Sequence, residues 1–506
     1  MLATIHTRAR LGVSAPPVMV EVHLSNGLPA LSIVGLPETG VKESKDRVRS
    51  ALLNAGFEFP AKRITINLAP ADLPKEGGRF DLPIALGILA ASGQLPPEGL
   101  DTIECLGELS LDGAVRSVFG VLPAVMAARA QGRTILVPQA NAEEASLAAG
   151  DDVIAVNHLL TVCAHLTGSE RLAPLQPFEL PDTSPEAPDM ADVKGQHVPK
   201  RALEIAAAGG HNLLLFGPPG TGKSMLASRL PGILPPLTDG HALEVASVHS
   251  VAGLAIQPGQ WRRPPFRAPH HTASSVALVG GGSAPRPGEI SLAHRGVLFL
   301  DELPEFDRKV LEVLREPMES GEIVISRAAR QLTFPARFQV IAAMNPCPCG
   351  YRGHPSIDCQ CTPQQVARYQ AKLSGPLLDR FDLHVEVPVQ AGSLLLNTAP
   401  EKVDSRQIRE RVELARARQL ARGCINAQLS GKALQQHCQP PEEGEAILSR
   451  AMEKLGLSAR ALHRILRVAR TLADLAGDEA IGKAHLVEAL GYRKLDQSRN
   501  QPSMVS

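Results

Sequence analysis

The amino-acid sequence predicts an α/β protein with an all-helical end. Three continuous apolar segments, at 211–216, 296–300 and 338–343, have the composition of strands buried on both faces of a parallel sheet. A glycine-rich loop follows the first of these segments, and only helical patterns occur from residue 404 onward. With 506 residues, the chain is long enough for about three folded units. We therefore expect a doubly wound parallel sheet with a second folded unit before it and a helical unit after it.

Composition and charge exclude several classes of protein. The 52 Lys and Arg residues balance 52 Asp and Glu residues, so no protein-wide positive field attracts nucleic acid or an anionic membrane. With 12 Phe, 3 Tyr and 1 Trp, the chain has too few aromatic rings to stack many bases, and any nucleic acid should be contacted through its backbone. The N-terminus lacks the pattern of a secretory signal, and the longest apolar-rich stretch, 82–91, is too short to span a membrane. We expect a cytoplasmic protein without a membrane partner.

The first third of the chain mixes strand and helix patterns. The expected elements are a half-buried strand at 18–31, a helix at 38–55, a strand at 64–68, helices at 82–92 and 122–130, and a strand at 134–138. They predict an α+β domain over 1–168. Residues 169–191 are rich in proline and acidic residues and have no hydrophobic period, which is typical of a linker. We place the α/β core at 192–395 and the helical unit at 396–498.

A phosphate-binding loop lies between the first apolar strand and a helix expected at 225–230. Its sequence fits the pattern G-x-x-x-x-G-K-[ST]. The backbone N–H groups of such a loop surround phosphates, Lys223 neutralises the β and γ oxygens, and the Ser224 hydroxyl ligates Mg²⁺. The sequence therefore predicts ATP and Mg²⁺ as cofactors. The nucleotide-binding residues are Gly217, Pro218, Pro219, Gly220, Thr221, Gly222, Lys223 and Ser224.

Polar residues follow the other two apolar strands at the same expected edge of the sheet. The second strand ends in Asp301 and Glu302. Asp301 would hold Mg²⁺ through water, and Glu302 would polarise the water that attacks the γ-phosphate. The third strand ends at Asn345, whose amide would contact the γ-phosphate. An acidic pair at a helix N-terminus and a turn asparagine are the alternatives, but the nearby phosphate loop favours the catalytic roles.

Residues 193–387 resemble an AAA+ ATPase on these motifs. The phosphate loop corresponds to Walker A, the strand ending in the acidic pair to Walker B, and Asn345 to sensor 1. The resemblance implies a ring hexamer in which Arg380 acts as an arginine finger on the neighbouring subunit's nucleotide. The alternative for Arg380 is a surface ion pair with Asp379 or Asp382.

The end of the chain is expected to form a helical lid. The helical patterns lie at 405–422, 442–455, 458–476 and 478–492. On the third helix, the AAA+ resemblance implies a sensor 2 arginine at Arg460 that acts in catalysis, although Arg464 and Arg467 lie on nearby faces.

Two segments narrow the resemblance within the AAA+ class. Residues 322–334 alternate as a β-hairpin with Arg327 and Arg330 at its tip, directly before the sensor 1 strand. A glycine-rich insertion at 264–288 separates the two Walker motifs. These features resemble the clade of magnesium-chelatase motor subunits and replicative helicases, whose hairpin faces the ring's pore. That resemblance implies that Arg327 and Arg330 meet DNA phosphates, whereas charge alone favours a solvated hairpin tip.

The first domain resembles the proteolytic domain of Lon, which implies a fold like domain 2 of ribosomal protein S5. The resemblance lies in the segments 74–77 and 107–113. Arg79 stands where the Lon serine should be, and Pro123 stands where the catalytic lysine should be. Because a Ser/Lys dyad needs both a nucleophile and an amine, peptidase activity is excluded.

Four of the eight cysteines lie close together in the sequence, at Cys347, Cys349, Cys359 and Cys361. They provide the number of thiolates that a tetrahedral zinc site requires. Eight cysteines in a chain of this length do not form a disulfide scaffold. The C-x-C spacing is tight for zinc, so His354 or Asp358 would be able to replace one ligand, and free thiols or a redox disulfide are the alternatives.

Over nearly its whole length, the chain resembles the ComM (YifB) family of magnesium-chelatase-like proteins. The features that carry this resemblance are the Lon-like domain, the AAA+ core, the Asn-Pro-Cys-Pro-Cys-Gly segment at 345–350 and the helical lid. It implies a hexameric ATP-driven helicase that promotes branch migration on single-stranded and branched DNA during natural transformation and recombination. A magnesium-chelatase motor and a protein-remodelling scaffold, ordered by nucleotide binding alone, are the alternatives.

Overall fold

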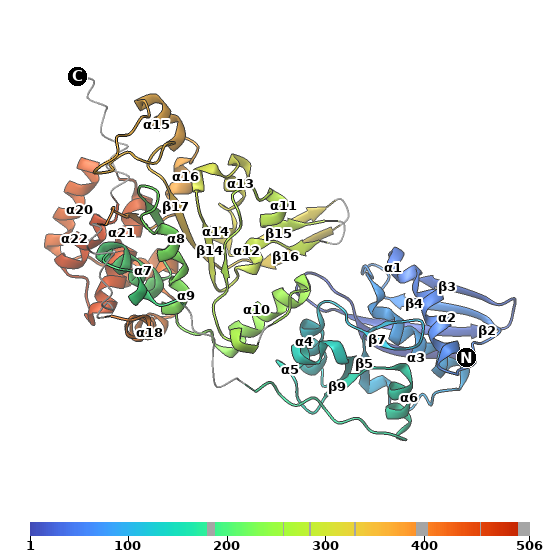
Figure 1. Ribbon diagram of the computed structural model, residues 1–506. Coiled ribbons are helices and arrows are strands. Elements are labelled where there is room, and N and C mark those ends of the chain that lie inside the picture. Colours follow the sequence, from blue (N-terminus) through green and yellow to red (C-terminus); the bar gives the residue numbers. More distant parts are fainter. Residues whose placement is uncertain are drawn as a thin grey trace.

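Two large β-sheets and a C-terminal group of helices organise the chain (Figure 1). The computed structural model describes residues 1–179, 188–256, 258–282, 285–327, 330–390, 403–455 and 457–493. The mixed α/β architecture with a parallel sheet and a helical end confirms the predicted fold class. Among the described residues, no helix combines the length and the apolar composition that crossing a membrane requires.

The first sheet lies in the N-terminal unit, residues 1–168, and has the strand order β3-β4-β2-β1-β5-β8-β9. Its strands are β1 (Leu2–Arg8), β2 (Pro17–Ser25), β3 (Ala30–Val34), β4 (Arg63–Ala69), β5 (Ile103–Cys105), β8 (Thr134–Pro138) and β9 (Val153–Val156). The pairs β1-β2 and β2-β4 are antiparallel, and the other neighbours are parallel. The unit also contains a small pair, β6 (Glu108–Leu109) and β7 (Val115–Arg116).

Six helices accompany this sheet. They are α1 (Thr39–Lys42), α2 (Ser44–Asn54), α3 (Asp81–Ser92), α4 (Val121–Ala130), α5 (Ala142–Ser146) and α6 (Leu159–Thr167). Two expectations are corrected here. The strand expected at 18–31 is the two strands β2 and β3, because the chain bends between them at Gly27, where φ is +148°. The helix expected at 38–55 is divided into α1 and α2 at Glu43.

The second sheet has five parallel strands in the order β11-β14-β17-β10-β18. They are β11 (Phe266–Arg267), β14 (Val297–Leu300), β17 (Gln339–Met344), β10 (Leu213–Phe216) and β18 (Leu383–Glu386). Side chains alternate across a strand. Leu213 and Leu215 accordingly lie in one hydrophobic core and Leu214 in another, on the opposite face. The predicted doubly wound sheet is therefore buried on both faces.

Helices surround the second sheet. They are α7 (His197–Gly209), α8 (Lys223–Ser228), α9 (Leu230–Ile233), α10 (Asp239–Ala252), α11 (Ser275–Val279), α12 (Glu289–Leu292), α13 (Arg308–Val313), α14 (Pro317–Ser320), α15 (Pro363–Gln370) and α16 (Gly375–Leu378). The helix expected at 225–230 begins earlier, at Lys223, directly after the phosphate loop. The segment expected as an insertion at 264–288 contains β11, an edge strand of the sheet itself.

The expected hairpin is present as β15 (Glu322–Arg327) and β16 (Arg330–Pro335), which pair antiparallel with Arg327 opposite Arg330. It projects beyond the second sheet (Figure 1). The residues at its tip, 328 and 329, and the side chains of Arg327 and Arg330 lie outside the described part, so their predicted contact with DNA stays a prediction. A smaller pair, β12 (Gly280–Gly281) and β13 (Arg286–Pro287), lies within the 264–288 segment.

The C-terminal helices share a hydrophobic core with α7 and one face of the second sheet. They are α18 (Ser405–Ala421), α19 (Gly431–His437), α20 (Glu442–Leu455), α21 (Ala459–Ala476) and α22 (Lys483–Gly491). The last of them starts at Lys483 and not at 478 as expected, because residues 478–482 serve as the joint to α21.

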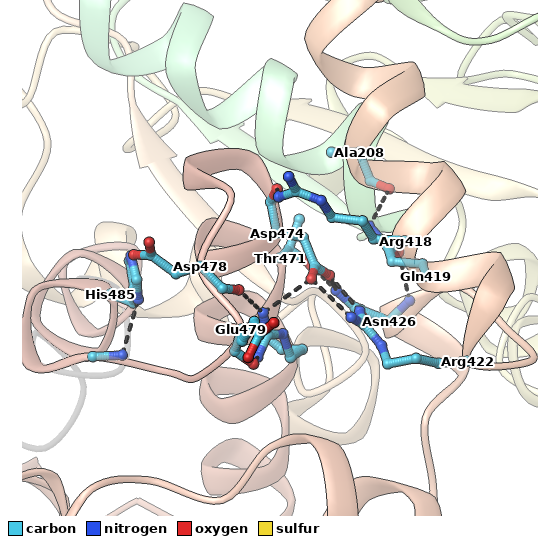
Figure 2. A network of polar contacts seen from close by, with 12 residues as sticks. Ala208, Arg418, Gln419, Arg422, Asn426, Thr471, Asp474, Asp478, Glu479 and His485 are labelled. Atoms are coloured by element: carbon cyan, nitrogen blue, oxygen red, sulfur yellow. Dashed lines mark hydrogen bonds and ion pairs between the residues drawn. The ribbon is translucent and has the colours of Figure 1, made fainter.

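Polar contacts around Asp474 set the orientation of α21 (Figure 2). The buried carboxylate accepts hydrogen bonds from Arg422 at 2.5 and 2.9 Å and from Asn426 at 2.7 Å. Gln419 continues the network to α7 by donating to the carbonyl of Ala208 at 3.1 Å. Since a buried carboxylate left without these donors would be costly, the network holds α18 and α21 together.

The expected linker at 169–191 packs in part against the N-terminal unit. The backbone N–H of Leu175 donates to the carbonyl of Val153 at 2.7 Å, and that of Phe178 donates to Ser146 at 3.0 Å. The Phe178 ring lies 6.0 Å from that of Trp261, measured between centroids. Backbone hydrogen bonds to the N-terminal unit and the ring contact with Trp261 thus attach the first part of the linker to both units, while 180–187 lie outside the described residues.

Candidate nucleotide site

The phosphate loop connects β10 to α8 at the carboxyl edge of the second sheet. A Cβ atom on Gly217 would stand 2.3 Å from the carbonyl oxygen of Val387, so only glycine permits this close approach. Gln196, which sequence reasoning missed, donates to the carbonyls of Thr221 at 3.2 Å and Pro388 at 2.9 Å. The loop is thereby fixed against β18 with its backbone at the N-terminus of α8, the end of a helix that favours anions.

Lys223 is buried and joins the phosphate loop to the end of β17. Its Nζ donates to the carbonyls of Gly217 and Pro218, both at 2.8 Å, and to Oδ1 of Asn345 at 3.1 Å. Burial lowers the pKa of Lys223 to about 8, although the charges of Asp301 and Glu302 act in the opposite direction. The predicted Walker A lysine and sensor 1 asparagine are therefore brought into direct contact.

Ser224 and Asp301 also meet at this edge. The Ser224 hydroxyl donates to Oδ2 of Asp301 at 2.5 Å, and Oδ1 of the same carboxylate accepts from the backbone N–H of Glu302 at 2.8 Å. A hydroxyl beside a carboxylate provides the oxygen ligands that Mg²⁺ prefers. The two predicted Mg²⁺ residues thus have a donor set that fits the ion.

Glu302 has a left-handed backbone conformation, with φ +51° and ψ 45°. For a residue with a side chain this conformation costs about 1 kcal/mol. Its Oε2 lies 3.1 Å from Nδ1 of His271, in the segment that follows β11. Sequence reasoning missed His271, although the adjacent pair His270-His271 between the two Walker motifs was a visible signal.

Arg380 lies at the opposite, amino edge of the same sheet. Its carbonyl oxygen accepts from the side-chain amide of Asn212 at 3.0 Å, and Asn212 directly precedes β10, whereas the phosphate loop follows β10. Four residues of strand separate the two edges by roughly 13 Å. Arg380 therefore does not join the phosphate loop of its own chain.

The Arg380 guanidinium is held by acceptors of its own chain. It forms an ion pair with Glu319 at 2.6 Å and donates to the carbonyls of Arg315 at 3.1 Å and Pro376 at 2.6 Å. The alternative expectation named Asp379 or Asp382 as its ion-pair partner, but the pair observed is with Glu319, which belongs to α14. These groups line an open hollow of about 580 Å³ formed by Glu312, Arg315, Glu316, Glu319, Ser320 and Arg380.

Two arginines of α21 lie beside Arg380. Arg464 pairs with Asp382 at 2.7 Å and donates to the Arg380 carbonyl at 3.3 Å. Arg460 is exposed one turn earlier on α21. Burial lowers the pKa of Arg380, and the nearby charge of Arg460 lowers it further. The arginines for which catalytic roles were predicted thus gather at the amino edge, away from Lys223.

The cysteine cluster lies directly against the phosphate loop. The four sulfurs of Cys347, Cys349, Cys359 and Cys361 all lie within 4.8 Å of one another. The nearest pairs are 3.4 Å and 3.6 Å apart. Thiolates around zinc at about 2.3 Å stand roughly 3.8 Å from each other, so the arrangement fits a tetrahedral site without His354 or Asp358. A Cβ atom on Gly350 would lie 2.8 Å from Cδ of Pro219, which shows how closely the two loops approach.

The N-terminal unit has a buried arginine, Arg79, at the position that the Lon resemblance assigns to the serine. The Arg79 guanidinium donates to the carbonyl of Phe119 at 3.5 Å, and burial lowers the pKa of Arg79 to about 10. Pro123 is buried within α4. Neither side chain is a nucleophile or a general base, and the absence of peptidase activity stays a prediction.

Three protein families match this chain. Magnesium chelatase subunit ChlI matches residues 189–394, a family described as subunit ChlI of Mg-chelatase matches residues 20–141, and the ChlI C-terminal family matches residues 402–493. Together these matches cover the second sheet, the C-terminal helices and the first sheet except for β1, β9 and the start of β2.

Similar proteins span nearly the same length. The competence protein ComM of Haemophilus influenzae is 54% identical over 98% of this chain and 98% of its own length. The protein YifB of Escherichia coli, described as uncharacterized, is 52% identical over 98% of both chains. The magnesium-chelatase 38 kDa subunit of Cereibacter sphaeroides is 26% identical over 58% of this chain and 87% of that protein.

Proposed function

Because the chain belongs to the ComM (YifB) family of magnesium-chelatase-like AAA+ proteins, we propose that it is an ATP-hydrolysing motor that drives branch migration of DNA. The observation that carries the proposal is the convergence of Lys223, Asn345 and the Ser224-Asp301 pair at one sheet edge. A cation, an amide and a hydroxyl beside a carboxylate are the groups that phosphoryl transfer requires.

The proposed chemistry assigns one role to each residue of the carboxyl edge. The loop backbone and Lys223 bind the β- and γ-phosphates, and Asn345 orients the γ-phosphate. Ser224 and Asp301 would hold Mg²⁺, which when bound neutralises phosphate charge. Glu302 polarises the attacking water, since phosphoryl transfer needs positioning and charge neutralisation and no covalent bond to the protein.

The opposite edge supports assembly into a ring. Arg380 and Arg460 face away from their own phosphate loop, so they serve a nucleotide only if a neighbouring copy presents one. A guanidinium that reaches the nucleotide of a neighbouring copy stabilises the charge that develops on the γ-phosphate. Head-to-tail contacts of this kind close into a ring when the rotation between copies permits it, and we propose the homo-hexamer that the family resemblance implies.

DNA is the proposed partner of the ring. The relative in Haemophilus influenzae is named a competence protein, which supports a role with incoming DNA. On the hairpin, Arg327 and Arg330 form the last pair of opposite residues before the tip. Two arginines at this end of the hairpin make it basic. Because the chain has no net charge, contact with phosphates has to be local and directed to the backbone.

Zinc is the proposed occupant of the cysteine cluster. The four sulfurs have the number, the chemistry and the mutual distances of a closed structural site. Such a site would hold together the loop between β17 and α15, which touches the phosphate loop through Gly350.

A magnesium-chelatase motor is the second candidate, and it is favoured by the family matches along the chain. A porphyrin-dependent increase in ATP hydrolysis would support it. A scaffold that only binds nucleotide would keep its function in the Glu302→Gln variant, because binding without hydrolysis would be sufficient.

The test measures ATP-dependent branch migration on three- and four-stranded DNA. We expect movement with the unaltered chain and none with Lys223→Ala. Glu302→Gln should bind ATP but lose about 10²-fold or more in kcat and stop migration. Glu305→Gln is the matched control, because this neighbouring carboxylate pairs with Lys372 at 3.2 Å and has no proposed part in hydrolysis. ATP hydrolysis without any movement of DNA would contradict the proposal.

A further inference from the structure

The N-terminal unit contacts the hairpin β15–β16 through the turn that joins its first two strands. This turn, residues 11–14, is closed by two backbone hydrogen bonds between Leu11 and Ser14, both 3.0 Å long. Leu11 and Val13 pack against the hydrophobic core that includes Phe334 of β16. The hairpin and α10 lie on the side of the second unit that faces the N-terminal unit (Figure 1). Two segments that are distant in the sequence therefore share one core.

Gly12 shows how closely the turn approaches the hairpin. A Cβ atom at this position would lie 3.2 Å from the carbonyl oxygen of Thr333 and 4.0 Å from Cε1 of Phe334. The φ angle of Gly12 is +61°, a left-handed conformation that glycine adopts without steric cost. Both the backbone of the turn and its close contact with β16 therefore favour glycine.

The hairpin depends on the groups that its buried face contacts. An isolated two-stranded hairpin is at best marginally stable in water, so its position is set by packing. The hairpin side chains that are buried in this core are Ile323, Ile325, Leu332 and Phe334. Because Leu11 and Val13 pack against the same core, the 11–14 turn is one of the elements that fix the hairpin on the second unit.

A separate contact attaches the N-terminal unit to α10 and β13. The backbone N–H of Gly120 donates to the carbonyl of Ser250 at 3.1 Å. The Phe119 ring lies 4.9 Å from the guanidinium carbon of Arg286, measured to the ring centroid. A Cβ atom on Gly253 would stand 2.4 Å from the same ring. Since this contact does not involve the hairpin, it supports the N-terminal unit independently of the 11–14 turn.

Arg10 connects the 11–14 turn to this second contact. Its guanidinium pairs with Glu76 at 3.1 Å, and both side chains are 14% exposed. Its Cδ atom would lie 3.5 Å from a Cβ atom on Gly120. Glu76 belongs to the segment 74–77, which carries part of the Lon resemblance. In this chain that segment holds the base of the turn, a role that requires no Ser/Lys dyad.

We propose that the N-terminal unit supports the hairpin through the 11–14 turn and so positions the arginines at its tip for contact with DNA. The inference rests on the proposed function, in which Arg327 and Arg330 meet DNA phosphates. It gives the N-terminal unit a part in the motor without a catalytic residue. When the support is removed, the hairpin should open more often, and ATP hydrolysis should respond less to DNA.

Hydrogen exchange of the backbone amides of β15 and β16 tests the support in the full chain without nucleotide or DNA. Leu11→Ser combined with Val13→Ser removes the apolar contact and keeps Gly12. Exchange in the hairpin should be about tenfold faster, because two partly buried apolar side chains no longer stabilise its closed state. Leu28→Ser is the matched control, since Leu28 lies in another turn of the same unit and is 88% exposed.

ATP hydrolysis with and without branched DNA tests the consequence for the motor. In the double variant, hydrolysis without DNA should stay within about twofold of the original rate. The stimulation by DNA should fall about fivefold, because a smaller fraction of hairpins holds the tip in position. Val13→Ala removes only two methyl groups and should accelerate exchange in the hairpin about threefold, which keeps the inference testable if the double variant does not fold.

Three results would overturn the inference. They are unchanged exchange in the hairpin, an equal acceleration with Leu28→Ser, and faster exchange that leaves the stimulation by DNA intact. Absence of stimulation by DNA in the unaltered chain would instead refute the proposed function, and the exchange of the hairpin amides would still decide whether the 11–14 turn supports the hairpin.

Discussion

The two edges of the second sheet differ in the chemistry that they present. At the carboxyl edge, Lys223, Asn345 and the Ser224-Asp301 pair contact one another around the phosphate loop. At the amino edge, Arg380 and Arg464 are paired with acidic side chains and carbonyl oxygens. In our proposal, the groups at the carboxyl edge bind and activate a triphosphate, and the cations at the amino edge stabilise the triphosphate of a neighbouring copy.

This difference shows why one copy of the chain is an incomplete catalyst in our proposal. The strand length keeps the two groups apart within a molecule, yet head-to-tail packing would bring the amino edge of one copy to the carboxyl edge of the next. The acceptors that now hold Arg380 are a carboxylate and two carbonyl oxygens. A γ-phosphate presents the same kind of oxygen, with more charge, and would replace them.

Substitution of Arg380, the proposed arginine finger, is expected to have the largest effect on ATP hydrolysis. Arg380→Ala should reduce kcat for ATP by about 10³-fold while ATP binding is kept, because only the transition-state charge loses its partner. ATP turnover and nucleotide affinity are measured side by side. Arg315→Ala is the matched control, since Arg315 lines the same hollow but pairs with Glu312.

A mixture of two inactive variants tests whether Arg380 acts on the nucleotide of a neighbouring copy or on that of its own chain. When Arg380→Ala and Lys223→Ala are combined in equal amounts, random assembly leaves about a quarter of the shared sites complete, and a corresponding activity should return. A mixture as inactive as its components would show that the two edges do not meet between copies.

A proton should be taken up when ATP binds at the carboxyl edge. Burial lowers the pKa of Lys223 to about 8 in the free chain, so the amine is mostly neutral above that pH. Bound phosphates favour the charged amine and raise its pKa again, which couples binding to protonation. ATP affinity should therefore fall by about fivefold between pH 8 and pH 9.

Calorimetry in two buffers with different heats of ionisation measures this proton directly. We expect uptake of nearly one proton at about pH 9, about half a proton at pH 8 and much less near pH 7. Lys309→Ala, which removes an exposed lysine of α13, should leave the uptake unchanged. Binding heats that do not depend on the buffer would contradict the proposed protonation of Lys223.

Loss of zinc should reduce ATP hydrolysis less than the substitutions above, because the cysteine loop contacts the phosphate loop mainly through packing. Cys359→Ser or a chelator should lower Tm by several degrees and change kcat by less than about threefold. Bound zinc per chain and thermal unfolding are measured together. Cys424→Ser is the control outside the cluster, and a chain that binds no zinc when purified would refute the metal assignment.

Regular elements with a strong local pattern could be predicted well. The strand at 134–138 and the helix at 442–455 have the expected bounds, and the three long apolar strands are all in the second sheet. β11 and β18 were missed for a physical reason. β11 has only two residues, and the four residues of β18 include His384 and Glu386, so neither forms a continuous apolar segment, and pairing with β14 and β10 makes them strands.

Some residues of the candidate site could likewise be predicted from the sequence, and others could not. Walker A, the acidic pair and Asn345 could be located from the sequence because each follows a recognisable apolar strand, and parallel strands end at a common edge. His271 and Glu319 were not located, since the residue that each contacts is distant in the sequence. The separation of Arg380 from the phosphate loop of its own chain could not be predicted from the sequence either.

The sequence by itself therefore determined the phosphate loop, the polar residues that follow the apolar strands, the four clustered cysteines and the residue types at positions 79 and 123. Only the tertiary structure decided that Lys223 contacts Asn345, that the arginines gather at the opposite edge and that His271 contacts Glu302. Motifs are encoded in neighbouring residues, whose backbone preferences and hydrophobic spacing act locally. Contacts between remote residues depend on strand order, which is set by the packing of the whole sheet.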